Sequence, residues 1–128
     1  MMTRIGMITA VAMGASLFVA SQAFAAGNAA AGKKFFDGVC AMCHNDTKGA
    51  GAKIGPNLFG VIGRKAGSVA GFDYSPAMKK ANFVWTEEKV AAYVNNPQQV
   101  VPGNRMPYGG AHNMQNANDV AAYLATLK

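Results

Sequence analysis

The stretch Cys40-Ala41-Met42-Cys43-His44 is the most informative part of this chain, because it contains both cysteines and one of the two histidines. On one helical turn, positions i, i+3 and i+4 share a face. Two sulfur atoms and one imidazole can therefore point at the same flat object. The rest of the sequence would then have to supply the walls that enclose it.

The chemistry that fits this turn best is covalent attachment of a haem. In a C-x-x-C-H run the two thiols form thioether bonds to the vinyl groups of haem c, and the histidine reaches the iron. A thioredoxin-like redox pair would need a βαβ unit, which the sequence lacks. A disulfide between residues three positions apart closes too small a loop to stabilise the fold much. Structural zinc generally needs four ligands, and outside this turn the only other histidine of the sequence is His112. We expect one haem c, held by Cys40, Cys43 and His44.

The first 25 residues have the composition of a secretory signal peptide. Arg4 precedes an apolar or small run over residues 5–19, and Ala23-Phe24-Ala25 has the small-x-small pattern of a cleavage site. An uncleaved membrane anchor is the alternative, since about 20 uncharged residues can span a bilayer. We expect cleavage after Ala25, one mature domain over residues 26–128 and a periplasmic location.

The formal net charge of +6 at pH 7 shows a basic chain. Such a surface attracts nucleic acid, anionic membranes or acidic proteins. An exported protein rarely meets nucleic acid, so we expect acidic protein partners and no nucleic acid. A scattered, solvated charge without a partner is the alternative.

The two ends of the mature domain are predicted to be helices. Asn28 can cap the first, whose expected buried face consists of Gly32, Phe36, Val39 and Cys40. The last helix is expected from about Asn116 to the C-terminus, with an apolar stripe formed by Val120, Tyr123, Leu124 and Leu127. This stripe suits packing on the first helix.

Two further helices are predicted in the middle of the domain. Ser75 is a cap before Pro76, and Thr86 is a cap with acidic residues after it. The second of these helices ends before Pro97. Residues 48–72 are rich in glycine and predict a loop, and no segment alternates like a strand. The expected fold class is all-α, with long loops that have to wrap something.

The other motifs of the domain resemble those of the class I c-type cytochromes, in particular the cytochrome c2 and mitochondrial type. The matching residues are Gly55-Pro56-Asn57-Leu58, Gly63-Arg64, Gly71-Phe72-x-Tyr74, Trp85, Tyr93, Asn96-Pro97 and Pro102-Gly103-x-x-Met106. They cover essentially the whole mature chain. The resemblance implies the small cytochrome c fold, in which a few short helices and long loops surround one covalent haem.

The resemblance implies Met106 as the second axial ligand of the iron. It also implies that Pro56 accepts a hydrogen bond from the free nitrogen of His44, and that Tyr93 lies beside Met106. Other residues could in principle fill the sixth position: Met42, Met78, Met114 and His112. Met42 lies inside the attachment turn, and Met78 and Met114 are expected to fill the core on or beside helices.

The resemblance further implies that Arg64, Tyr74 and Trp85 hold a buried haem propionate. Asn104 replaces the usual threonine and can still donate a hydrogen bond to a propionate. At the crossing of the first and last helices, Gly32 and Phe36 are expected to pack against Val120 and Tyr123. Among the departures, Met78 replaces the common asparagine, and several lysines around the haem edge are replaced, by Val39, Gln98 and His112 among others. The basic residues that the resemblance leaves near the haem edge are Lys34, Lys53 and Arg105.

The function implied by the resemblance is that of a soluble one-electron carrier rather than an enzyme. Its expected partners have acidic docking faces: a cytochrome bc1-type donor and an oxidase, reductase or reaction-centre acceptor. The chain is expected to be a monomer. A membrane-anchored electron-transfer cytochrome, a haem c redox sensor and a peroxidase-type enzyme are the alternatives, and the last would need an open sixth position on the iron.

Overall fold

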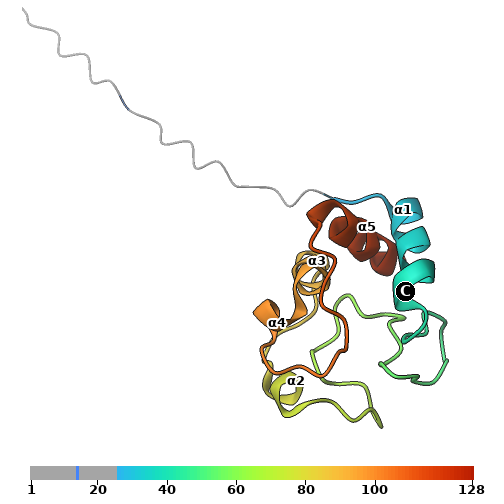
Figure 1. The fold of residues 1–128 in the computed structure, drawn as a ribbon, viewed down its shortest axis with the longest axis vertical. Helices are drawn as coiled ribbons and strands as arrows, with labels where there is room; N and C mark the ends of the chain where they lie inside the picture. The colour runs from blue at the N-terminus through green and yellow to red at the C-terminus, as the bar shows by residue number, and fades with distance from the viewer. Residues whose placement is uncertain (1–13, 15–25) are drawn as a thin grey trace, which may run out of the picture.

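The computed structural model describes Gly14 and residues 26–128, so the expected signal peptide and its cleavage site after Ala25 lie outside the described residues. The described chain is helical (Figure 1), with elements α1 (Ala29–Phe35), η1 (Phe36–Cys40), α2 (Pro76–Lys80), α3 (Glu87–Asn95), α4 (Pro97–Val100) and α5 (Met114–Ala125). Within residues 26–128 the sole β-type pairing is an isolated bridge between Lys65 and Val84. The all-α prediction is confirmed.

Side-chain caps begin the helices at the predicted positions. Asn28 Oδ1 accepts from the Ala31 backbone N–H at 3.0 Å, and Thr86 Oγ1 accepts from the Lys89 N–H at 3.0 Å. Ser75 caps α2 in the same way, through the Met78 N–H. These caps satisfy N–H groups that a helix leaves unpaired at its start.

Two helix boundaries differ from the sequence-based expectation. Short helix α4 directly follows α3, because Asn96 caps it and Pro97 occupies its first position. The last helix starts at Met114 rather than at about Asn116, since Asn113 Oδ1 accepts from the Asn116 N–H at 3.1 Å. In the part of the chain that the structure describes, no helix is both long and apolar enough to cross a membrane.

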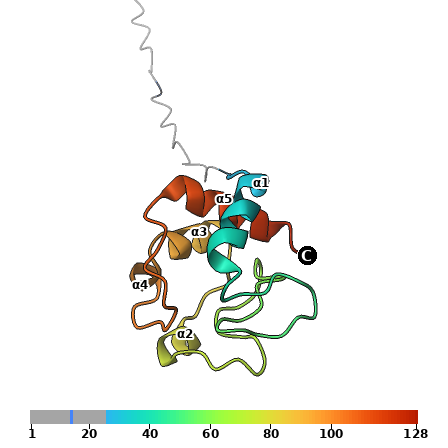
Figure 2. The same cartoon turned by 45° about the vertical axis from the view of Figure 1, so that its right-hand side comes forward.

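Helices α1 and α5 pack against each other at one end of the molecule (Figures 1 and 2). Gly32 lies at the crossing, where a Cβ atom would overlap the backbone carbonyl of Asp119. Next to it, the rings of Phe36 and Tyr123 are 5.6 Å apart, and Val120 is fully buried. The predicted contact between the terminal helices is therefore confirmed, and it depends on a residue without a side chain.

The prediction that Val39 belongs to the buried face of the first helix is wrong. The helix changes after Phe35 to a π-helical turn, in which Ala41 N–H donates to the Phe36 carbonyl at 2.8 Å. This wider turn shifts the residues after Phe36 around the axis. Phe36 stays buried, whereas Val39 is 40% exposed.

The long loops lie below the crossing and enclose the middle of the molecule (Figure 2). Residues 48–72 are irregular, as predicted. Backbone hydrogen bonds join their end to the segment before α3, where Gly63 N–H donates to the Trp85 carbonyl at 2.7 Å and Trp85 N–H donates to the Arg64 carbonyl at 2.9 Å. They fix Trp85 against Tyr93 of α3, with ring centroids 5.1 Å apart.

Candidate haem site

A cavity of about 470 Å³ occupies the middle of the domain. Its wall includes the attachment turn, the segments around Gly55 and Tyr74, helices α3 and α5, and residues 104–108. The volume lies within the usual range of cofactor and small-molecule sites. The cavity is therefore the place where elements from the whole domain meet.

Cys40, Cys43 and His44 all line this cavity. Cys43 N–H and His44 N–H both donate to the Cys40 carbonyl, at 3.0 and 2.9 Å, so the run forms the predicted helical turn. The cysteines are not joined in a disulfide. Burial, with a smaller contribution from Cys43, raises the pKa of the Cys40 thiol to about 11. A thiol of this kind does not have the low pKa typical of redox-active pairs.

The His44 ring is fixed from two sides. Its Nδ1 atom lies 2.7 Å from the Pro56 carbonyl oxygen, which can only accept, so Nδ1 carries the proton and Nε2 keeps its lone pair. A Cβ at Gly55 would overlap the ring. Burial lowers the pKa of His44, partly opposed by the hydrogen bond to Pro56. The imidazole is thus held neutral, as a metal ligand must be.

Met106 lines the same cavity and is held from its own loop. Asn104 Oδ1 accepts from the Met106 N–H at 2.9 Å, while Asn104 Nδ2 donates to the Val101 carbonyl at 2.9 Å. The buried Asn104 amide therefore serves the loop, a role that the sequence did not suggest. Gln98, which takes the place of a haem-edge lysine, also holds this turn. Its Oε1 atom accepts from the Gly103 N–H, and its Nε2 donates to the Asn104 carbonyl.

The other methionines differ in their surroundings. Met78 is buried and lines the cavity from α2, whereas Met42 is 78% exposed. Met114 is 46% exposed, so the expectation that it fills the core is wrong. The reason is that α5 begins at Met114 itself, and the first three residues of this helix are exposed.

Arg64, Tyr74 and Trp85 all line the cavity, and the backbones of Arg64 and Trp85 are hydrogen-bonded to each other. The Arg64 guanidinium donates to the Asn57 carbonyl at 3.0 Å, and burial lowers its pKa. Within residues 26–128 no carboxylate lies within ion-pair distance of it. Tyr74 Oη accepts from the Val69 N–H at 3.1 Å. A partly buried cation without a carboxylate suits a ligand that brings its own acidic group.

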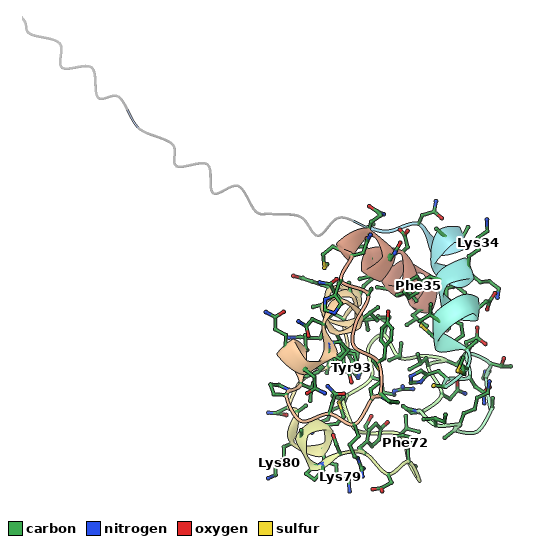
Figure 3. The ribbon with its side chains drawn as sticks, viewed as in Figure 1. Lys34, Phe35, Phe72, Lys79, Lys80 and Tyr93 are labelled. Carbon is green, nitrogen blue, oxygen red and sulfur yellow. The ribbon has the colours of Figure 1, made fainter. Side chains whose placement is uncertain are left out.

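These features fit a haem c. The cavity offers apolar walls, a neutral imidazole, a thioether sulfur, two adjacent thiols and a cation for a propionate. Figure 3 shows Tyr93 pointing from α3 toward this interior, while Lys34 and Lys80 point outward. The zinc alternative lacks its ligands among the described residues, where no three His, Cys, Asp or Glu side chains come together.

Two of the basic residues expected near the haem edge have polar partners. Lys53 Nζ donates to the Ala41 carbonyl at 2.8 Å, and Arg105 contacts Asp73. Exposed apolar side chains at the rim are Val39, Met42 and Ile54. The Asp73 carboxylate therefore partly offsets the charge of Arg105, whereas Lys53, bonded to a neutral carbonyl, keeps its charge for an acidic partner.

Comparisons with known proteins agree with this reading. The sequence model of the family described as Cytochrome c matches residues 29–128. Cytochrome c2 of Rhodopila globiformis is 43% identical over 102 residues, covering 80% of this chain and 95% of that protein. Cytochrome c of Gossypium barbadense is 44% identical over 98 residues, covering 77% and 88%. The chain therefore belongs to the cytochrome c family of electron-transfer proteins, which carry a covalently attached haem c.

Proposed function

We propose that this protein is a soluble, periplasmic one-electron shuttle whose haem is bonded through Cys40 and Cys43 and whose iron is ligated by His44 and Met106. The observation that carries the proposal is the shared cavity, which the attachment turn and Met106 line together. The two segments come from different sides of the middle of the molecule (Figure 1). A ligand from each side would close the iron to small molecules.

The bound haem supplies a reversible one-electron change at its iron. The chain's residues set the conditions for that change. The Pro56 carbonyl keeps the His44 proton on Nδ1 and makes the ring a better donor. Ligation by methionine together with histidine would raise the reduction potential of the iron and favour its ferrous state. With the haem bound, the apolar wall would keep water away from it, and the reorganisation on electron transfer would be small.

We further assign the inner propionate to Arg64, Tyr74 and Trp85. The support is their common position on the cavity wall and the lack of an acidic partner for Arg64 among the described residues. Tyr93, whose pKa burial raises to about 12, would stay neutral beside the Met106 sulfur. Asn104 would act mainly by holding the backbone of Met106.

The proposed partners are acidic redox proteins: a cytochrome bc1-type donor and an oxidase, reductase or reaction-centre acceptor. The positive net charge supports this choice. A monomer cleaved after Ala25 and working in the periplasm is proposed, with the likeness to a cytochrome c2 as support. The intact mass should equal residues 26–128 plus one haem, and a membrane-bound chain that retains residues 1–25 would contradict this.

The covalent attachment has a direct test. Thioether bonds survive denaturation and reduction, so the haem should stay on the chain after extraction with acidified acetone. Replacing both Cys40 and Cys43 by serine should abolish stable holoprotein. A colourless polypeptide with the mass of the bare chain after extraction of the unmodified protein would refute the attachment.

The axial ligand is tested by Met106→Ala. Loss of the thioether should remove the far-red sulfur-to-iron band of the ferric protein, lower the potential and allow rapid binding of cyanide. Met78→Leu, Met114→Leu and His112→Gln are controls that should keep the band. If the unmodified protein is already high-spin and binds carbon monoxide at once, the closed-site carrier is wrong.

A further inference from the structure

The loop that carries Met106 has few hydrogen bonds to distant segments before Ala111 and His112, whose N–H groups donate to the Val94 and Asn95 carbonyls at 2.9 and 3.2 Å. The turn before Met106 is held by Asn104 and by Gln98, both close in sequence. From residue 105 to residue 110, a single hydrogen bond in the described structure reaches a distant segment. It runs from Arg105 Nη2 to the backbone carbonyl of Asp73, at 3.0 Å.

The same guanidinium also faces the Asp73 carboxylate, with Nη2 3.6 Å from Oδ2. Lys79 Nζ lies 3.7 Å from the other carboxylate oxygen, at the corner of the molecule marked by Phe72 and Lys79 in Figure 3. Asp73 and Arg105 both line the cavity. The contact therefore joins two parts of the wall, one of which carries Tyr74 and the other Met106.

We propose that Arg105 is a positioning residue, which holds the Met106 loop closed over the cavity through Asp73. The inference rests on the proposed ligation of iron by Met106. When the loop opens, the iron–sulfur bond breaks and an added ligand takes the free position, with no change in the oxidation state of the iron. The frequency of opening is therefore the property that Arg105 controls.

The expected effect is modest, because the contact is exposed. The Asp73 side chain is 83% exposed and that of Arg105 is 57% exposed, and exposed ion pairs are weak and sensitive to salt. The loop has no other long-range hydrogen bond between residues 105 and 110 in the described structure, so this contact acts on loop opening. It contributes little to global unfolding.

The experiment uses ferric holoprotein mixed with imidazole, kept neutral at alkaline pH so that its own charge plays no part. The decay of the far-red band gives the rate of ligand entry. Arg105→Gln should raise this rate about threefold to fivefold at low salt. Arg105→Lys should bind imidazole at nearly the rate of the unmodified protein. Asp73→Asn keeps the backbone carbonyl and should therefore raise the rate less than Arg105→Gln does.

Salt supplies a second readout. From about 0.01 M to about 1 M salt the screening length falls from about 30 Å to about 3 Å. The rate of the unmodified protein should rise over this range, whereas that of Arg105→Gln should stay nearly constant. Lys33→Gln is the matched control, because it removes an exposed ion pair to Asp37 in α1 and η1, with N–O distance 2.8 Å. It should leave the rate unchanged.

The failures of the two proposals are distinguishable. If the unmodified protein has no far-red band, ligation by Met106 is wrong and the inference falls with it. If the band is present and Arg105→Gln and Asp73→Asn both bind imidazole at the parental rate, Met106 ligation stands and the role of Arg105 is refuted. An equal increase in Lys33→Gln would also refute it, since the effect would then be one of general stability.

Discussion

The crossing of α1 and α5 and the loop over residues 101–113 form two parts of the same site in different ways. At the crossing, residues about 90 positions apart in the chain meet through backbone and rings, as Gly32 does with Asp119 and Phe36 with Tyr123. In the loop, Met106 is held by polar contacts, and most of them are local.

Because of this difference, the global stability of the domain and the local opening of the Met106 loop should depend on different contacts. Close apolar packing is lost only when the helices part, so the crossing should unfold together with the whole domain. A loop held by a few hydrogen bonds can open while the helices remain. The side of the site that bears the attachment turn is thus expected to be rigid, and the side that bears Met106 to be the one that yields first.

The largest expected effect comes from Gly32→Ala. The new Cβ would overlap the Asp119 carbonyl, and the helices would have to separate, at a cost of about 3 kcal/mol. The midpoint of thermal unfolding of the holoprotein should fall by more than about 10 °C. Gly38→Ala is the matched control, because nothing lies within 4 Å of a Cβ at that position. Equal midpoints for the two variants would refute the role of the crossing.

Asn104→Ala should act on the loop and leave the crossing intact. It removes the acceptor for the Met106 N–H and one of the two donors to the Val101 carbonyl, a local loss of about 2 kcal/mol. On heating, the far-red band should disappear well before the helical circular dichroism. Asn104→Asp keeps the acceptor for the Met106 N–H, so its far-red band should disappear at a temperature between those of the unmodified protein and of Asn104→Ala. Simultaneous loss of both signals in Asn104→Ala would show that loop and helices are not separable.

Tyr123→Phe tests a polar contact of the crossing. Tyr123 Oη donates to Asp46 Oδ2 at 2.5 Å, and its loss should cost about 1 kcal/mol of unfolding free energy.

The difference in unfolding free energy between the unmodified protein and Tyr123→Phe should depend on pH. Burial, and then the bond to Asp46, raise the pKa of Tyr123 to about 12. The fold favours the neutral hydroxyl, so the stabilisation is complete below about pH 10 and is lost as the pH rises toward 12. Denaturant titrations of both proteins should therefore converge in that window. Comparing the two proteins cancels the contribution of Tyr93, whose pKa is raised to a similar value. A difference that is constant up to pH 12 would contradict the assignment.

The smallest effect concerns docking. Because Asp73 partly offsets the charge of Arg105, steering of an acidic redox partner should rest mainly on Lys34 and Lys53 and should be weak. The bimolecular rate of electron transfer should fall with ionic strength by at most about tenfold, as measured by stopped flow. A flat or rising rate would reject electrostatic steering.

Local chemistry in the sequence was enough to predict much of this protein. The caps at Asn28, Ser75 and Thr86 and the turn from Cys40 to His44 depend on neighbours within four residues, and all four are present in the structure. The family resemblance supplied the cavity-lining residues, including Pro56 and Met106, and the cytochrome c family was confirmed. Short-range hydrogen bonds and fixed spacing make such features readable from the chain alone.

Only the tertiary structure decided several further features, some of them local and some joining distant segments. The π-helical turn moved Val39 out of the core, the Asn104 amide found its partners within the loop, and the start of α5 left Met114 exposed. The contacts of Tyr123 with Asp46 and of Arg105 with Asp73 link residues 77 and 32 positions apart. Composition and periodicity do not tell how close two such residues lie in space, because the packing of the whole chain sets that distance.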